Sequence, residues 1–387
     1  MYLGYVSPFL VYNTACTMAN PTRLASIAVI GLMLAACAPQ SVKQRIDPFP
    51  LTFPLVEAGT LEIEGHIVGQ PRVRDGIVYL ATREGYLTAV VVPSRSVLWR
   101  FKADHTISAG PELGESHVIV HDDAHRFYLL DLKGVLIFRK QIDGEVTTAI
   151  RESGGQLFFG GSGGKIAALD VSNNGAESWS YQAPGPVTAG PVVVDDRVIF
   201  GTADGRLLAL GFDGRKAWEF TAAGALSVDP AAAGGRLYFG TDDRYFYCLN
   251  ASTGKKVWSR RLQGAPLHPA LVCGPRLAVA ASNSVVYLLA RRGGSILSWE
   301  AVASRIIHDL AAAGPSLLVS SAAPDFAALD ARSGKRAGQY EASGPLAAGA
   351  VWSPPFIMLA VEEEEAGRQR LVFLAPGPGR QPQPGKN

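Results

Sequence analysis

The chain has 387 residues, of which 48% are hydrophobic and 42 are glycine, and its formal net charge is +2. This composition suits a folded, turn-rich β protein and is unlike that of a disordered chain. A net charge so close to zero gives no argument for a nucleic-acid or other polyanionic partner, and none is expected.

The first 36 residues have the layout of a secretory signal peptide. Arg23 gives a positive flank, and residues 24–36 form an apolar stretch interrupted only by Ser26. The stretch is too short to span a membrane comfortably. Residues 1–17 are surplus to such a signal, so translation could start at Met18 instead of Met1.

The signal ends in Leu-Ala-Ala-Cys37, which resembles the bacterial lipoprotein box. This resemblance implies cleavage before Cys37 and a lipid attached to it. The alternative is an ordinary secretory signal with a coincidental cysteine. Ala38 replaces the Asp of an inner-membrane retention signal, which favours the periplasmic face of the outer membrane in a Gram-negative host. Residues 37–54 then form a lipidated, proline-containing tether.

A repeat of about 40 residues begins after this tether. Residues 235–258 read as three short strands and two turns, and residues 77–99, 157–179 and 198–218 repeat that pattern. An aromatic residue recurs at intervals of 39 to 41 residues. The series is Trp99, Phe138, Trp179, Trp218, Trp258, Trp299 and Tyr340. An all-β repeat of this period predicts a β-propeller.

A small-residue segment precedes each unit and is predicted to be the innermost strand, and there are eight such segments. They are residues 69–71, 109–111, 148–150, 189–191, 228–230, 267–269, 307–309 and 348–350. The last unit lacks an outermost strand, and residues 57–64 read as a strand without a blade. The sequence therefore predicts an eight-bladed propeller over residues 55–376, with four-stranded antiparallel blades and an N-terminal strand closing the ring. Residues 377–387 are predicted to be a disordered tail.

The repeated aromatic residues have two interpretations. One such ring could stack on a planar ligand, whereas recurrence in blade after blade favours packing of the outermost strand against the next blade. We therefore interpret the seven aromatic residues as structural.

Several polar clusters are candidates for chemistry. His117, His121, Asp122, Asp123 and His125 could hold a transition metal or could simply form a turn. Residues 362–365 are four glutamates that could attract Ca²⁺ or form a solvated charge run. His268 and His308 precede the inner strands of adjacent blades and could face the central channel. No catalytic motif or metal-type cysteine spacing occurs, so no catalytic or metal-binding residue is assigned.

Two cysteines lie within the repeat. Cys248 and Cys273 could form a disulfide in an oxidising compartment, or they could be two small buried side chains.

The segments 248–258 and 328–335 carry the pattern Leu-Asp/Asn-x-x-x-Gly-Lys, followed in the first by Trp. This pattern resembles the pyrroloquinoline quinone (PQQ)-type propeller repeat and covers about four fifths of the chain. The PQQ family includes dehydrogenases, which are much longer and carry a vicinal cysteine pair and calcium ligands beside the quinone. This chain has no adjacent cysteines, and we expect a non-catalytic protein without a cofactor.

A lipid-anchored, eight-bladed propeller of this size resembles the BamB family of the outer-membrane β-barrel assembly machinery. This resemblance implies a scaffold that binds the barrel-forming subunit and unfolded outer-membrane proteins. Its partner-binding loops would correspond to segments such as residues 183–189 and 222–228. Two alternatives remain, a different periplasmic interaction or sensing propeller and a small PQQ-dependent dehydrogenase.

Overall fold

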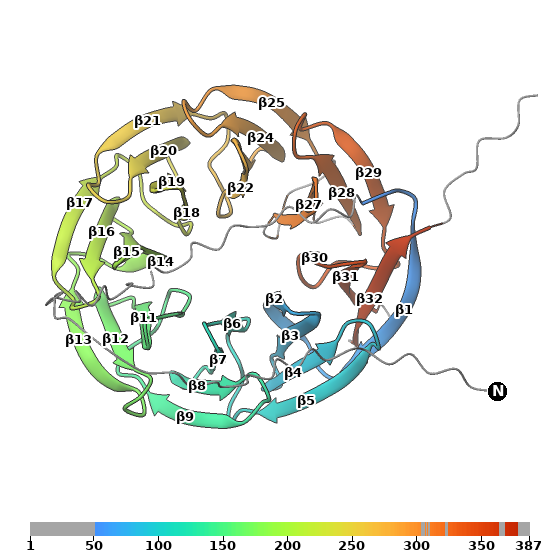
Figure 1. The fold of residues 1–387 in the computed structure, drawn as a ribbon, viewed down its shortest axis with the longest axis horizontal. Helices are drawn as coiled ribbons and strands as arrows, with labels where there is room; N and C mark the ends of the chain where they lie inside the picture. The colour runs from blue at the N-terminus through green and yellow to red at the C-terminus, as the bar shows by residue number, and fades with distance from the viewer. Residues whose placement is uncertain are drawn as a thin grey trace, which may run out of the picture. The chain divides into compact units, whose positions relative to one another are not determined.

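The computed structural model describes residues 51–302, 306, 308, 310–321, 324–363 and 368–377. Within these residues the chain forms eight four-stranded antiparallel sheets and no helix. Figure 1 shows the sheets as the blades of a ring, with the first strand of each blade near the centre and the last on the rim. The predicted eight-bladed propeller is confirmed. The signal peptide, Cys37, the tether before residue 51 and the tail after residue 377 lie outside the described residues.

The blades are numbered along the chain, and their strands are given from the innermost outward. Blades 1 to 4 are β2 (Ile67–Arg74), β3 (Ile77–Thr82), β4 (Tyr86–Val91), β5 (Ser96–Lys102); β6 (Glu112–Leu113), β7 (His117–His121), β8 (Arg126–Asp131), β9 (Leu136–Gln141); β10 (Arg151–Ser153), β11 (Gln156–Gly160), β12 (Lys165–Asp170), β13 (Ala176–Gln182); and β14 (Val187–Val194), β15 (Arg197–Thr202), β16 (Arg206–Gly211), β17 (Lys216–Thr221). Blades 5 to 8 are β18 (Ala231–Ala233), β19 (Arg236–Gly240), β20 (Tyr245–Asn250), β21 (Lys256–Arg261); β22 (Leu271–Cys273), β23 (Arg276–Ala281), β24 (Val285–Ala290), β25 (Ile296–Ala301); β26 (Ala311–Ala313), β27 (Ser316–Ser320), β28 (Asp325–Asp330), β29 (Arg336–Glu341); and β30 (Val351–Ser353), β31 (Phe356–Glu362), β32 (Gln369–Pro376), β1 (Leu55–Ile63).

The two middle strands of each blade form the core. In β16 the residues Leu207–Leu210 are completely buried, because both faces of the sheet are covered by neighbouring blades. Such strands are continuous apolar runs and do not alternate between apolar and polar residues. The outermost strands instead alternate between half-buried and exposed residues, as in β13 and β29. The hydrophobic core therefore lies between successive blades, around the whole ring.

The N-terminal strand closes the ring. The strand β1 pairs antiparallel with β32 from Leu55–Pro376 to Ile63–Gln369, so the eighth blade combines both ends of the described chain. The buried amide of Gln369 accepts a hydrogen bond from the backbone N–H of Ile67 at 2.6 Å, which ties blade 8 to blade 1. Closure leaves no blade without a neighbour on either side.

Most inner strands begin later than predicted. The predicted segments lie inside β2 and β14 but end just before the inner strand in the other blades whose segments are fully described. Proline alone does not explain the difference, because Pro111 and Pro230 precede shortened strands whereas the equivalent Pro71 and Pro191 lie inside β2 and β14. The inner strands of those blades are two or three residues long, and they still mark the centre of the ring.

Between the outermost strand of a blade and the following blade lies a recurring position for one side chain, which we call the slot. In four blades a tryptophan fills it and donates its indole N–H to a carbonyl 33 residues further on, at 2.7 to 3.2 Å. The ring also packs on a turn glycine with positive φ, such as Gly294 beneath Trp258. Phe138 is 7% exposed and packs on Gly175 in the same way. The slot residues are Trp99, Phe138, Trp179, Trp218 and Trp258.

The prediction that Trp299 and Tyr340 continue this series is wrong. In strand pairing, Ser298 and Gly338 take the place of Trp258, because they pair with Leu288 and Ala328 as Trp258 pairs with Cys248. Trp299 is one residue further on, points to the other face of its sheet and is 63% exposed. Tyr340 is two residues beyond the slot, and its hydroxyl donates to Glu57 in β1 at 3.1 Å.

The slot of blade 7 is filled from outside the repeat. A Cβ atom at Gly338 would lie 2.3 Å from Cγ of Phe53, so the Phe53 ring occupies the space of a slot side chain. In blade 8 the third and fourth strands, β32 and β1, belong to opposite ends of the chain, so residues 51–54 stand where other blades have a turn. Gly377 donates to the carbonyl of Pro54 at 2.8 Å and secures this segment.

Candidate functional site

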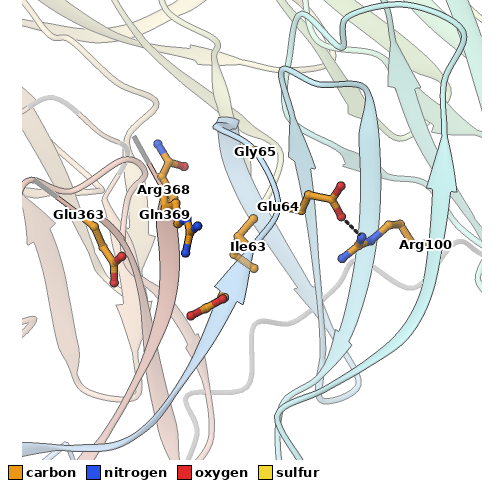
Figure 2. Close-up of a pocket in the computed structure, with 8 residues that line it drawn as sticks. Ile63, Glu64, Gly65, Arg100, Glu363, Arg368 and Gln369 are labelled. Atoms are coloured by element: carbon orange, nitrogen blue, oxygen red, sulfur yellow. Dashed lines mark hydrogen bonds and ion pairs between the residues drawn. The ribbon is translucent and has the colours of Figure 1, made fainter. Parts of the chain in front are cut away.

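A pocket of about 360 Å³ opens where the ring closes. Its walls are the end of β1, the start of β32 and the outermost strand of blade 1, as Figure 2 shows. Arg100 crosses from β5 to form an ion pair with Glu64. The remaining charged side chains on the wall are Glu62, Glu363 and Arg368. Both charge signs are present, so this pocket has no strong preference for a charged ligand.

The glutamate run lies beside this pocket and is only partly described. Glu362 accepts a hydrogen bond from the Gln369 amide at 3.3 Å, and Glu363 lies 3.7 Å from the Arg370 guanidinium. Glu364 and Glu365 lie outside the described residues. The two described carboxylates therefore have protein partners instead of converging on a shared cation site.

A larger pocket of about 580 Å³ lies near the ring axis, at the inner ends of blades 1 to 3. An ionic chain links the three inner strands beside it. Glu112 in β6 lies 3.0 Å from Arg72 in β2 and 3.8 Å from Arg151 in β10. Sequence reasoning missed this chain, although the three residues are 39 or 40 positions apart and thus follow the repeat. Its charges hold neighbouring inner strands together at the pocket wall.

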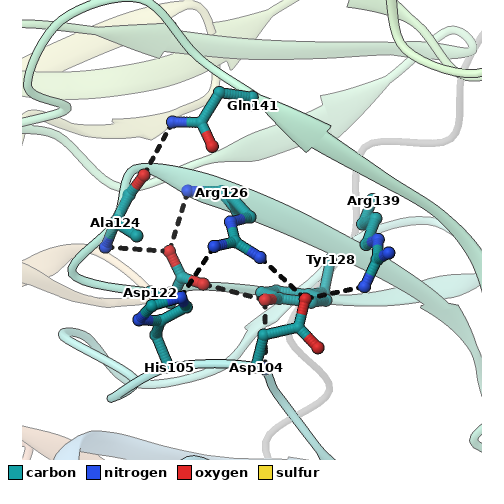
Figure 3. A network of polar contacts seen from close by, with 8 residues as sticks. All are labelled: Asp104, His105, Asp122, Ala124, Arg126, Tyr128, Arg139 and Gln141. Atoms are coloured by element: carbon teal, nitrogen blue, oxygen red, sulfur yellow. Dashed lines mark hydrogen bonds and ion pairs between the residues drawn. The ribbon is translucent and has the colours of Figure 1, made fainter.

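The histidine and aspartate cluster of blade 2 forms a structured turn. Asp122 is buried, and its carboxylate accepts the backbone N–H groups of Ala124 and Arg126 at 3.0 and 2.9 Å and the Tyr128 hydroxyl at 2.8 Å (Figure 3). Burial, followed by this hydrogen bond, raises the pKa of Tyr128 to about 12. Nearby, the Asp104 carboxylate accepts hydrogen bonds from the guanidinium groups of Arg126 and Arg139, each at 2.7 Å. Asp122 is thus used to shape the turn.

The histidines of this cluster point in different directions. His117 bonds to Glu152 of blade 3 at 2.6 Å, with the carboxyl group almost fully buried. His121 packs edge-on to Phe127, and burial lowers its pKa. His125 takes the positive-φ position of the turn, and it lines the larger pocket together with His121, Asp122 and Asp123. No group of three or more His, Cys, Asp or Glu side chains in the described part of the chain is arranged to hold a metal ion.

Of the two histidines of blades 6 and 7, His308 lies in a contact between blades. His308 donates from Nε2 to the carbonyl of Leu346 in the next blade at 3.3 Å, and both His268 and His308 are partly buried. Neither lines the two pockets above. Their spacing by one repeat reflects their equivalent positions in the blades.

The two repeat cysteines are free thiols. Cys248 is buried in the contact between blades 5 and 6, and Cys273 is partly buried at the end of β22. Burial raises the pKa of both thiols to about 11. Of the two sequence-based interpretations, the structure supports two small buried side chains.

The loops expected to bind partners bury most of their apolar residues. Ala183, Leu226 and Val228 are 8% exposed or less, whereas Pro184, Pro186, Ala223 and Ser227 face solvent. Each loop therefore presents a few exposed residues on a rigid base.

These features define the class of the protein, a β-propeller with eight four-stranded blades of the PQQ-repeat type. A model of the family described as outer membrane protein assembly factor BamB matches residues 83–225 and 211–345. The chain belongs to this family.

Solved structures with the same fold come from several kinds of protein. BamB from Moraxella catarrhalis is similar with a TM-score of 0.70 and 17% identity, over 83% of this chain and 100% of that chain. The computationally designed Ika8 protein is similar with a TM-score of 0.70 and 14% identity, over 81% of this chain and 97% of that chain. Quinohemoprotein alcohol dehydrogenase from Comamonas testosteroni is similar with a TM-score of 0.64 and 12% identity, over 86% of this chain and 78% of that chain. Identities this low support the shared fold alone.

No curated protein sequence matches this chain. The described residues include no helix that is long and apolar enough to cross a membrane.

Proposed function

We propose that this protein is a non-catalytic, lipid-anchored scaffold for the assembly and insertion of β-barrel proteins into the outer membrane. The observation that carries the proposal is the family match, because it spans most of the blades. The signal and Cys37 in the sequence support attachment to the periplasmic face of that membrane. Its partners would be the barrel-forming subunit and unfolded outer-membrane proteins.

The architecture is compatible with a scaffold. The polar clusters of the described chain are used in turns and in contacts between blades, as for Asp122 and for Glu112 with its two arginines. The loops between blades offer exposed residues on a closed, rigid ring. Binding by such a ring requires little ordering of the backbone, which keeps the entropic cost of association low.

The test is affinity purification of the tagged, lipidated chain from solubilised envelope, followed by mass spectrometry. Recovery of a barrel-assembly subunit at a near-stoichiometric level is expected. Recovery of other envelope proteins in its place would favour a different periplasmic interaction or sensing propeller. A Cys37→Ser chain serves as a control, because without the acyl anchor it should be released from the membrane fraction by high salt without losing its fold.

The loops provide a sharper version of this experiment. Ala223→Arg together with Ser227→Arg places two charges on one exposed loop and should reduce recovery of the partner. Gln263→Arg, which adds one charge to the loop that follows β21 at an exposed position, is the control. Equal recovery of the partner with the parent chain and with both variants would show that the 222–228 loop does not bind the partner.

The similarity to a quinohemoprotein dehydrogenase motivates a second candidate, a small quinone-dependent enzyme. The chain would then reduce an electron-accepting dye when supplied with pyrroloquinoline quinone, Ca²⁺ and an alcohol. We expect no reduction above the rate of the quinone alone. Dye reduction that saturates with quinone would overturn the scaffold proposal.

A further inference from the structure

One end of blades 5 to 7 carries an unbalanced positive charge. Because the strands of a blade are antiparallel, the first and third turns of each blade lie at the same end of the ring. In blades 5, 6 and 7 the third turn, together with the first residue of β21 in blade 5, contributes two cations per blade to that end, six in all. They are Lys255, Lys256, Arg291, Arg292, Arg332 and Lys335.

These cations are not neutralised locally. None of the six forms an ion pair with another described residue. The first and third turns of these blades contain no acid. Asp330, at the end of β28 beside the third turn of blade 7, accepts the backbone N–H groups of Arg332 and Ser333 at 3.0 and 2.7 Å. Although burial acts to raise the pKa of this carboxyl, the hydrogen bonds from Ser333 and the charge of Arg332 help to lower it. Apart from Arg291, which donates to the Gly274 carbonyl, the cations are exposed and free to meet an external anion.

The turns are held at fixed positions on the rim. The turn that carries Arg291 and Arg292 packs on the preceding strand β21, where Trp258 donates to the Arg291 carbonyl at 3.2 Å and Arg260 donates to the Gly294 carbonyl at 2.9 Å. The turn that carries Lys335 packs on β25, because a Cβ atom at Gly334 would meet the Ser298 hydroxyl at 2.3 Å. The positive charge is therefore carried at fixed positions on three adjacent blades.

Exposed apolar side chains lie beside these cations. Val257 follows Lys256 in β21, and Ile296, Leu297 and Trp299 follow the Arg291–Arg292 turn in β25. Their exposed fractions are 41%, 42%, 51% and 63%. Figure 1 shows β21 and β25 as neighbours on the rim. We call the six cations and these four apolar residues the basic rim.

The rest of the ring differs in charge. At the opposite end the turns of blades 2 and 8 carry Asp122, Asp123, Glu362 and Glu363. Blades 1 and 2 also expose apolar residues on their outermost strands, where Arg100 pairs with Glu64 and Arg139 with Asp104. Lys133, beside the exposed Val135, forms no ion pair with a described residue, but no exposed tryptophan lies near it. The combination of unpaired cations with an exposed tryptophan is specific to the basic rim among the described residues.

We propose that the basic rim docks on the surface of a lipid bilayer that contains anionic lipid. Lysine and arginine side chains bind the anionic headgroups, and the aliphatic side chains and Trp299 enter the interfacial layer. A bilayer fits better than a small anion, because the cations are spread over three blades and neither pocket described above includes them. Tryptophan at the water–lipid boundary gains apolar burial while its N–H stays hydrated.

The proposal is tested with the chain from residue 37 onward carrying Cys37→Ser, so that neither an acyl chain nor the apolar residues 24–36 contribute and no protein partner is needed. Cosedimentation is measured with vesicles of phosphatidylcholine, with and without phosphatidylglycerol, at low and high salt. Binding should require phosphatidylglycerol and weaken at high salt. Lys256→Glu, Arg292→Glu and Lys335→Glu together should abolish binding, since each cation contributes roughly a fivefold factor.

A matched triple variant separates this surface from net charge. Arg83→Glu, Lys133→Glu and Arg244→Glu change the net charge equally at exposed positions outside the basic rim and should leave binding nearly unchanged. Tryptophan emission should shift to shorter wavelength on binding, and the shift should be lost in Trp299→Phe. Three results would each overturn the proposal. They are no binding to phosphatidylglycerol vesicles, an equal loss of vesicle binding in the two triple variants, or binding to polyglutamate that is as strong as binding to the vesicles.

Discussion

The contact between blades 5 and 6 and the contact between blades 7 and 8 fill the same slot in different ways. Trp258 fills the first from its own strand, packs on Gly294 and bonds to the Arg291 carbonyl. In the second, the strand contributes only Gly338, and the ring comes from Phe53 in the segment before β1. The repeat therefore fixes the position of the slot, whereas the side chain that occupies it can come from elsewhere in the chain.

The contact between blades 6 and 7 is a third case. Ser298 occupies the slot, and its hydroxyl is buried without a hydrogen-bond partner among the described residues. The neighbouring Trp299 is exposed instead of filling the slot. A smaller side chain at this slot leaves a weaker contact, because less apolar surface is buried there.

The largest effect is expected where a tryptophan fills the slot. Trp258→Ala removes the ring and leaves a cavity between two blades, so the free energy of unfolding should fall by ~3–5 kcal/mol. Trp299→Ala removes the same side chain from the surface and should change it by less than about 0.5 kcal/mol. Urea unfolding at equilibrium measures both. Equal losses in the two variants would show that the slot has no special role.

A smaller loss is expected at the slot filled by Phe53. Phe53→Ala should cost about 1–3 kcal/mol, because the ring is only partly buried. Gly338→Phe should destabilise the parent chain by clashing with Phe53, yet it should restore stability in the Phe53→Ala chain. A double-mutant cycle measured by urea unfolding would show this reversal of sign. Additive losses would mean that the two residues do not share one slot.

At Ser298 a substitution is expected to raise the free energy of unfolding instead of lowering it. Ser298→Ala removes a buried hydroxyl that lacks a partner and should stabilise the fold by about 1 kcal/mol. Thermal unfolding of this variant, beside Ser180→Ala on the outermost strand of blade 3 as a control, checks the prediction. A loss of stability at Ser298 would indicate that its hydroxyl makes a favourable contact in solution.

The smallest effect is expected in the pH dependence of stability, through the contact of Tyr340 with β1 of blade 8. Burial, followed by the charge of Glu57, raises the pKa of Tyr340 to about 12. The neutral phenol is thus favoured in the folded state, so its contribution is complete below about pH 10 and is lost as the pH rises towards 12. Tyr340→Phe should remove this part of the alkaline loss of stability. An unchanged pH profile would place the titration at another tyrosine.

Much of this architecture could be predicted from the sequence, because the period of about 40 residues fixes the blades and their order. The slot itself could have been found by counting from the turn glycine. Trp258 lies four residues after Gly254, and the same count from Gly294 and Gly334 reaches Ser298 and Gly338 instead of Trp299 and Tyr340. Following the aromatic residues alone gave the wrong register for the last two.

Other features could not be predicted in this way. Phe53 lies outside the repeat, so no periodicity points to it, and its role depends on how the chain ends meet. The basic rim is also hidden in the net charge of +2, because acidic residues elsewhere in the chain balance it. Its cations are about 40 residues apart along the chain and come together only when blades 5 to 7 stand side by side.

The meeting of the two chain ends in blade 8 has a consequence for engineering. Leu55 pairs with Pro376, so residues 51 and 377 leave the ring at the same place, and the ring has no structural beginning. A circular permutant that joins these ends and opens the loop after β21 would keep every sheet intact. The new chain ends would then lie at a different blade, so the position at which another segment is fused to the ring can be changed independently of the surface of the ring.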